Sequence, residues 1–290
     1  MKIFNTKQEI KSFLHTQGEA NKTIGFVPTM GALHEGHLSL IKKAKKKNDL
    51  VVVSIFVNPT QFDNQEDLVK YPKTYKKDTK LLENVSCDVL FFPSVEEIYA
   101  NNVLPKKFNF DGLEHQMEGK FREGHFNGVG TIVKTLFEVI EPNNAYFGEK
   151  DFQQLKIIKK MVKKHHLNVK IKGCKIFREE DGLAMSSRNS RLNIEQRTSA
   201  PFIYRTLKKA RDKFETENTA KTTEWVKNQY AEQALRSQRG YQGPIEHFQP
   251  YEVGIFKGSR DSLGSGIVHR SPAISESGTT RLLLCLNKPL

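Results

Sequence analysis

Apolar, β-branched runs alternate with segments of helical periodicity through the first part of the chain. The apolar runs predict strands at 23–29, 50–57, 87–93, 145–148 and 169–177. The segments between them predict helices near 37–47, 74–84, 127–140 and 150–164. Apolar strands that alternate with helices are typical of a parallel sheet covered on both faces. Such sheets bind ligands at the carboxyl ends of their strands, where the unusual residues of this sequence cluster.

The periodicity changes near residue 177. A charged loop at 178–191, REEDGLAMSSRNSR, leads into helical segments near 195–214 and 219–233. The stretch 240–280 is rich in Gly, Ser and Pro and shows no clear alternation. We therefore predict a first domain at 1–176 and a smaller second domain at 177–290.

The composition is that of an ordinary globular protein, with 37% hydrophobic and 27% charged residues among 290. No apolar stretch approaches the ~20 residues of a membrane-spanning helix, and the N-terminal segment lacks the apolar core of a secretory signal. Three widely spaced cysteines fit neither a zinc site nor a disulfide framework. We expect a cytoplasmic protein with reduced thiols, no membrane partner and no disulfides.

The formal charge of +13 leaves an RNA-binding protein open as an alternative. Most of the excess is lysine on predicted helices, at 42–47 and 159–164, and no nucleic-acid-binding motif accompanies it. A solvated basic face that attracts anionic substrates is the preferred interpretation, with no nucleic acid as partner.

Two histidines three residues apart, His34 and His37, follow the first long strand and open a helix. They project to one side, where backbone N–H groups favour anions. Gly31 and Gly36 let a phosphate approach the backbone. This pattern favours a triphosphate site in which the imidazoles stabilise charge on the α-phosphate. A structural pair or half of a metal site is the alternative.

The charged loop contains Met185-Ser186-Ser187-Arg188-Asn189. Two hydroxyls and a guanidinium on a mobile loop could close over phosphates. Together with His34 and His37, this segment resembles the paired signatures of the nucleotidylyltransferase and class I aminoacyl-tRNA synthetase superfamily. A nucleotidylyltransferase acting on a phosphorylated acceptor is therefore a second alternative.

The sequence more closely resembles the pantothenate synthetase (pantoate–β-alanine ligase) family, over about residues 20–215. The resemblance rests on blocks in matching order at 28–40, 54–62, 71–72, 121–133, 146–155 and 178–189. It implies an α/β fold, with a Rossmann-like sheet and a smaller C-terminal α+β lid domain. It also implies a homodimer that ligates pantoate to β-alanine with ATP and Mg²⁺, through a pantoyl adenylate and with release of AMP and pyrophosphate.

The resemblance assigns roles to individual residues. The catalytic residues it implies are His34, His37, Lys150, Ser186, Ser187 and Arg188. The ATP-binding residues are these six together with Met30, Gly36, Gly148, Asp151, Phe177 and Met185. Pantoate is expected at Met30, Gln61 and Gln154, because amides offer donors and acceptors without charge to a polyol acid. Further active-site residues are Asn58, Tyr71, Glu118 and Arg122, and Asp78 matches a magnesium-associated acid.

Several of these residues also have a purely structural interpretation. Gln61 could bond the local backbone, Met30 could be core packing, Asp151 could be a helix dipole partner, and Arg122 could lie on the surface. The paired glutamines argue against the nucleotidylyltransferase. The stretch 240–290 departs from the family pattern, which places the sheet of the lid domain in question.

Overall fold

The structure is a computed structural model that describes residues 1–63, 65–100, 102–239, 254–256, 266–270 and 283–285. The chain forms two compact units, Met1–Phe177 and Arg178–Leu290. In the described part of the chain, no helix is both long and apolar enough to cross a membrane.

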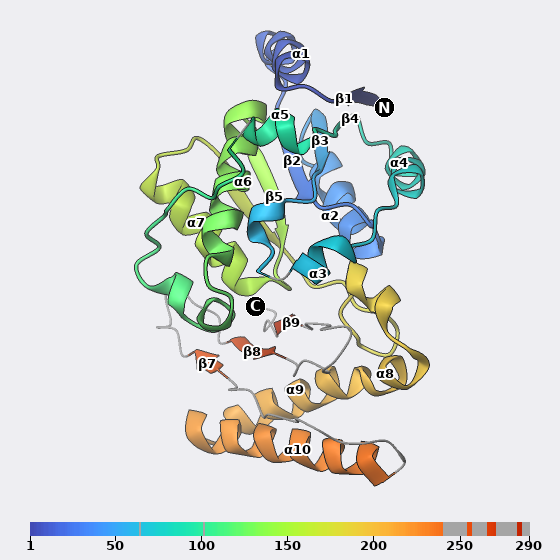
Figure 1. Cartoon of the computed structure of the whole chain (residues 1–290), viewed down its shortest axis with the longest axis vertical. Helices are drawn as coiled ribbons and strands as arrows, with labels where there is room; N and C mark the ends of the chain where they lie inside the picture. The colour runs from blue at the N-terminus through green and yellow to red at the C-terminus, as the bar shows by residue number, and fades with distance from the viewer. Residues whose placement is uncertain (64, 101, 240–253, 257–265, 271–282, 286–290) are drawn as a thin grey trace. The chain divides into compact units, whose positions relative to one another are not determined.

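The first unit is built on a parallel sheet of six strands in the order β1-β4-β3-β2-β5-β6 (Figure 1). The strands are β1 (Lys2–Phe4), β2 (Ile24–Thr29), β3 (Leu50–Ile55), β4 (Val89–Phe91), β5 (Asn144–Gly148) and β6 (Lys170–Cys174). The central strands β3 and β4 are buried along their whole length, which is why they are continuous apolar runs rather than alternating ones. The α/β fold with a Rossmann-like sheet is confirmed.

Helices cover both faces of this sheet, as predicted. Phe26, Val52 and Phe91 pack in one cluster with residues of the helices α1, α5, α6 and α7, and the intervening Val27 and Val53 pack in another with α2 and α4. The α-helices are α1 (Lys7–Glu19), α2 (Glu35–Lys45), α3 (Gln65–Val69), α4 (Tyr75–Asn84), α5 (Val95–Tyr99), α6 (His125–Ile140) and α7 (Phe152–Lys164). Three 3₁₀ turns are η1 (Pro59–Gln61), η2 (Leu113–His115) and η3 (Gly119–Phe121).

Strand β1 is absent from the prediction for a physical reason. It spans only three residues at the edge of the sheet, all at least partly exposed, so it has no apolar run to reveal it. It is held in the sheet by parallel pairing with β4, in which Ile3 lies opposite Leu90. Helix α1 follows at once and begins with a capping box in which Thr6 accepts from the backbone of Glu9.

The second unit begins with a short bridge between Arg178 and Ala184. A 3₁₀ turn, η4 (Ser187–Arg191), and the helices α8 (Ile194–Ser199), α9 (Pro201–Phe214) and α10 (Thr219–Arg239) follow. Pro201 has no backbone N–H, and α9 starts at this residue, so the helical segment predicted near 195–214 is divided in two.

Strands β7 (Gly254–Phe256), β8 (Gly266–Arg270) and β9 (Leu283–Cys285) form an antiparallel sheet within the stretch that was expected to depart from the family. The five residues of β8, GIVHR, neither alternate apolar with polar positions nor form a continuous apolar run, so this stretch did not indicate a sheet. The expectations for the rest of 240–290 lie outside the described residues.

Candidate active site

The candidate site lies at the carboxyl edge of the first unit's sheet. Strand β2 is flanked by β3 on one side and by β5 on the other, so the strand order reverses at this position. Open α/β sheets bind ligands beyond the carboxyl ends of their strands at such a point. Two segments leave these ends, Met30–His34 after β2 and Glu149–Asp151 after β5, and both carry predicted site residues.

The segment after β2 has an unusual backbone that a buried acid holds in place. Gly31 and Ala32 have φ of +78° and +49°. The carboxylate of Asp78 is 1% exposed and accepts from Ala32 N at 2.9 Å and Leu33 N at 2.8 Å. Thr74 Oγ1 donates to the same carboxylate. This arrangement fixes the path of the chain into His34.

His34 and His37 are brought together at the start of α2. His34 is the N-cap residue and makes no side-chain capping bond, and the two ring centroids lie 4.0 Å apart. The Nδ1 atom of His37 is buried and has no hydrogen-bond partner among the described residues. A buried polar atom without a partner costs stability, so its presence is typical of a site that binds a ligand.

His37 is held neutral. Burial is the main cause that lowers its pKa well below the usual 6.5, followed by the neighbouring His34 and by Lys150. At neutral pH its imidazole can therefore offer one N–H to an anion without adding a full charge. Tyr146 of β5 packs in one buried cluster with Leu38 and Ile41 of α2, so the segments after β2 and β5 lie near each other.

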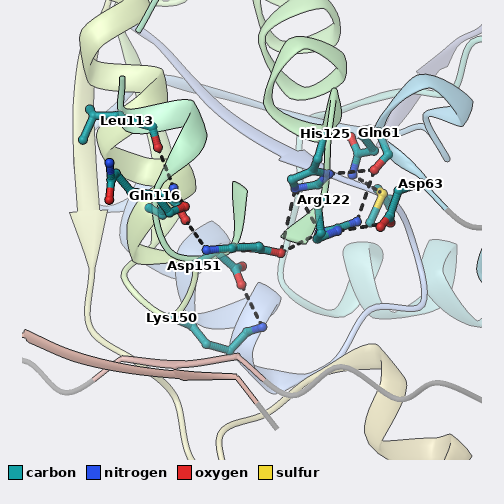
Figure 2. A network of polar contacts seen from close by, with 11 residues as sticks. Gln61, Asp63, Leu113, Gln116, Arg122, His125, Lys150 and Asp151 are labelled. Atoms are coloured by element: carbon teal, nitrogen blue, oxygen red, sulfur yellow. Dashed lines mark hydrogen bonds and ion pairs between the residues drawn. The ribbon is translucent and has the colours of Figure 1, made fainter. Parts of the chain in front are cut away.

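The segment after β5 carries the predicted cation and acid. Lys150 Nζ pairs with Asp151 Oδ1 at 3.0 Å, and Asp151 precedes α7 without making a side-chain capping bond (Figure 2). A Cβ added to Gly148 would meet no atom within 4 Å, which leaves open space beside the strand end. Phe177, at the end of the first unit, is 41% exposed.

Gln61 and Met30 meet, as expected of residues that share one ligand. Gln61 Nε2 lies 2.9 Å from Met30 Sδ. Asn58 is 1% exposed and holds the amide in place, because its Nδ2 donates to Gln61 Oε1 and to Gly128 O. Tyr99 donates in turn to Asn58 Oδ1. Asn58 is thus bonded within the protein and orients Gln61.

The two adjacent glutamines of α7 differ sharply in environment. Gln153 is buried, accepts from Glu118 N at 2.9 Å and donates to Leu113 O and Gln116 O. Gln154 is half-buried, and its amide makes no hydrogen bond within the described part of the chain. Gln153 is therefore structural, and Gln154 is the one available to a ligand.

Arg122 and His125 form a polar network around the backbone of Gln61 (Figure 2). Arg122 is not a surface residue, since its side chain is 10% exposed and pairs with Glu118 at 2.6 Å and Asp63 at 3.2 Å. It also donates to Gln61 O, which His125 Nδ1 approaches to 2.7 Å. Burial, with Arg122 as second cause, lowers the pKa of His125 to about 4, so its imidazole is neutral. Because Arg122 can only donate to Nε2, at 3.0 Å, and Gln61 O can only accept, Nδ1 carries the proton and donates.

Tyr71 and Asp78, two further predicted site residues, are buried and contact other groups of the protein. Tyr71 is 5% exposed and packs edge-on against Phe62. Asp78 was expected to bind magnesium, but its oxygens are engaged by two backbone amides and a hydroxyl, as described above. Among the described residues, no group of three or more His, Cys, Asp or Glu side chains could hold a metal ion. Asp78 thus holds the backbone of the segment after β2, and its assignment to magnesium stays a prediction.

The second unit carries the Met185–Arg188 segment in a structured turn. Ser186 caps η4 by accepting from Arg188 N at 3.3 Å. Asn189, the next residue, donates to Glu179 Oε1 and Ala184 O. These bonds hold the two residues that flank the segment, Ala184 and Asn189, within this unit, and the predicted mobility of the segment stays a prediction.

A comparison with known protein families decides which family this site belongs to. The family model of pantoate–β-alanine ligase matches residues 2–250. The chain belongs to the pantoate–β-alanine ligase family. It is an AMP-forming carbon–nitrogen ligase, which joins pantoate to β-alanine in an ATP-dependent reaction. A model of a family of unknown function, DUF1826, also matches residues 219–287.

Relatives and solved structures of this ligase family agree. The pantothenate synthetase of Christiangramia forsetii is 55% identical over 231 residues, which are 79% of this chain and 82% of that protein. That of Flavobacterium psychrophilum is 52% identical, over 81% of this chain and 84% of that protein. The crystal structure of pantothenate synthetase from Thermus thermophilus has a TM-score of 0.83 and 35% identity, with 99% of each chain covered. The Francisella tularensis pantoate-beta-alanine ligase complexed with beta-gamma ATP and beta-alanine has a TM-score of 0.76 and 34% identity, over 99% of this chain and 97% of that one.

Sequence reasoning missed three residues that contact the predicted site residues, namely Asp63, His125 and Gln153. His125 lies inside the family block FREGHF. Its sequence context does not reveal its partner, the backbone carbonyl of Gln61, which lies 64 positions earlier in the chain. Asp63 and Gln153 each directly adjoin a recognised block or lie within it. This position next to or inside a recognised block is the sequence feature that could have identified them. Their partners, Arg122 for Asp63 and the backbone of Glu118 for Gln153, are visible only in the structure.

Proposed function

We propose that both steps of the ligation take place at the carboxyl edge of β2 and β5. In the first step a pantoate carboxylate oxygen attacks the α-phosphorus of ATP, and the bond to pyrophosphate breaks. In the second step the amine of β-alanine attacks the acyl carbon, the bond to the adenylate oxygen breaks, and AMP leaves. The observation that carries this proposal is the buried, unpartnered Nδ1 of the neutral His37, beside Lys150.

His34 and His37 are proposed to act on the α-phosphate. Charge grows there during adenylation, and donors that are already in place need no reorganisation at that moment. The rings lie at the start of α2, where backbone N–H groups also favour an anion. Gly36 lies in the first turn of the same helix and leaves the backbone accessible.

Lys150, Asp151 and Gly148 are proposed to bind the nucleotide. A lysine is a compact charge suited to phosphate, and the carboxylate of Asp151 can accept from ribose hydroxyls. The space beside Gly148 gives the nucleotide room at the strand end. Ser186, Ser187 and Arg188 of the second unit are proposed to join as phosphate donors, and Met185 and Phe177 as apolar contacts of the nucleotide.

Gln61, Gln154 and Met30 are proposed to bind pantoate. The Gln61–Met30 contact places an amide beside an apolar surface, which fits an acid with hydroxyls and a branched carbon chain. Asn58, Glu118 and Arg122 then act as positioning residues, because their bonds hold the Gln61 backbone and amide. Tyr71 is proposed to border this region.

Magnesium is proposed to enter with ATP. Phosphates of a nucleotide and one or two carboxylates commonly hold Mg²⁺, and the ion neutralises phosphate charge. Because Asp78 is engaged elsewhere, the steps proposed above depend on the imidazoles and lysine of the chain itself. A homodimer and a cytoplasmic location are further proposals, which rest on the family resemblance alone.

Isotope transfer tests the reaction path. With pantoate labelled by oxygen-18 in its carboxylate, the adenylate path places one labelled oxygen in AMP and none in pyrophosphate. Attack at the γ-phosphate would instead yield ADP and labelled inorganic phosphate, and this outcome would contradict the proposal. Mass spectrometry of the nucleotide and phosphate products distinguishes the two.

A further inference from the structure

The segment Ser186–Arg188 is tied to a small hairpin in the second unit. Residues Arg178 and Ala184 form an antiparallel bridge, Glu179 N donates to Leu183 O at 2.8 Å, and Gly182 N donates back to Glu179 O at 2.9 Å. Gly182 has a φ of +91°, which disfavours other residues at this turn.

The hairpin packs closely on helix α9. A Cβ at Gly182 would collide with the ring of Tyr204, so the turn lies directly against this ring. The guanidinium of Arg178 lies 3.9 Å from the centroid of the same ring. These contacts attach the hairpin to the helical part of the unit.

A single arginine of α8 holds two carboxylates of the hairpin. Arg197 bonds Glu179 Oε2 at 2.6 Å through one nitrogen and Asp181 Oδ2 at 2.5 Å through the other. The capping box of α8, in which Asn193 accepts from Gln196 N, places Arg197 in the helix. A planar guanidinium with forked donors suits two fixed acceptors, whereas an ammonium would not.

Glu179 links this arginine to the phosphate-binding segment. While Oε2 accepts from Arg197, Oε1 accepts from Asn189 Nδ2 at 2.9 Å. Asn189 immediately follows Arg188, and its Nδ2 also donates to Ala184 O, just before Met185. A chain of bonds thus runs from Arg197 to both ends of the Met185–Arg188 segment.

These ion pairs are too exposed to matter greatly for folding. The side chains of Arg197 and Asp181 are each 36% exposed, and pairs of this kind contribute little to stability. Their geometry, with one guanidinium on two carboxylates, can nevertheless decide where the segment lies. A misplacement of about 1 Å can cost ~10²-fold in rate.

We propose that Arg197 is a positioning residue of the ligase, which holds Glu179 and Asp181 and thereby keeps Ser186, Ser187 and Arg188 in a preformed arrangement for ATP. The segment then reaches the nucleotide as part of a rigid hairpin rather than as a flexible loop. This inference rests on the proposed phosphate-binding role of Ser186–Arg188.

The test measures pantoate-dependent ATP–pyrophosphate exchange in the full-length Arg197→Lys enzyme. The expected kcat falls roughly 10- to 100-fold, while the melting temperature and the pantoate KM stay near those of the parent. Arg211→Lys is the matched control, because Arg211 is about equally exposed on α9 and, within the described part of the chain, its one ion pair is with its neighbour Asp212. This control keeps the parental rate.

Two further measurements separate positioning from a general loss of structure. Added guanidinium ion, at concentrations that do not denature the protein, restores exchange in Arg197→Ala, whereas sodium chloride at equal ionic strength does not. Glu179→Gln lowers kcat as Arg197→Lys does, and the double variant is no slower than either single one, because all three break one chain of bonds.

The outcomes are distinguishable from failure of the proposed function. Parental kcat in both Arg197→Lys and Arg197→Ala overturns the positioning role, as does a loss of kcat that tracks a loss of melting temperature. If the parent enzyme shows no exchange, the adenylation path itself fails. If Ser187→Ala and Arg188→Ala retain the full rate, the role of the segment fails, and the role of Arg197 fails with it.

Discussion

The backbone N–H of Leu33 donates to the buried carboxylate of Asp78 at 2.8 Å, so helix α4 sets the path of the chain into His34. In Asp78→Asn an NH₂ group replaces one acceptor, and a backbone N–H or the Thr74 hydroxyl loses its partner. An unsatisfied buried group costs ~1–3 kcal/mol. We expect the free energy of unfolding to fall by about this amount and adenylation to slow, with unchanged dependence on Mg²⁺.

Urea unfolding and a magnesium titration of the rate provide the measurements for Asp78. Thr74→Val is the matched control, because it removes the hydroxyl and leaves both backbone contacts in place. A variant of parental stability that needs far more Mg²⁺ for half-maximal rate would show that Asp78 acts on the metal instead.

Gln61→Ala and Gln154→Ala are expected to raise the pantoate KM about 5- to 150-fold, which corresponds to ~1–3 kcal/mol for hydroxyls left unpaired. The ATP KM should stay close to that of the parent. Gln153→Ala serves as the contrast, since its amide bonds only the protein, and it should lose stability. Steady-state kinetics with each substrate varied would refute the assignment if both KM values rose together.

The lowered pKa of the buried His125 should make the stability of the protein depend on pH. The native state keeps it neutral with a pKa of about 4, against 6.5 when unfolded, so the unfolded chain takes up a proton first as pH falls. Stability from this residue is complete above pH 6.5 and is lost as pH falls to about 4, on the order of 3 kcal/mol in all.

His125→Asn keeps a donor toward Gln61 O and removes this titration. Urea unfolding between pH 7 and pH 4 should therefore show a shallower loss of stability in the variant than in the parent. His37 contributes in the same direction, so only the difference between variant and parent reports on His125. A slope in His125→Asn equal to that of the parent would show that His125 is not held neutral.

Some of the structure follows from the sequence for clear physical reasons. Strand β3 is buried on both faces, so its residues are a continuous apolar run that any pattern analysis finds. The edge strand β1 has no such run and was missed. Strand β8, GIVHR, has neither an alternating pattern nor a continuous apolar run, so nothing in its sequence marked it as a strand.

The candidate site shows a different limit. Gln153 and Gln154 are chemically identical neighbours, and composition cannot say which one faces a ligand. The resemblance implies Gln154, and the structure shows that the amide of Gln153 is used within the protein. Asp78 is an acid near the site, and only the structure shows that two backbone amides use its oxygens. Such pairings join positions far apart in the sequence, so no local pattern reveals them.

The most direct test of the account is ATP–pyrophosphate exchange with pantoate alone, in the parent and in His37→Ala. The parent should exchange without β-alanine, because the adenylate forms before the amine is needed. Loss of a preorganised donor should lower the exchange kcat of His37→Ala by ~10²–10³, with ATP affinity and melting temperature near parental values. Exchange that strictly requires β-alanine, or full exchange by a folded His37→Ala enzyme, would contradict the account.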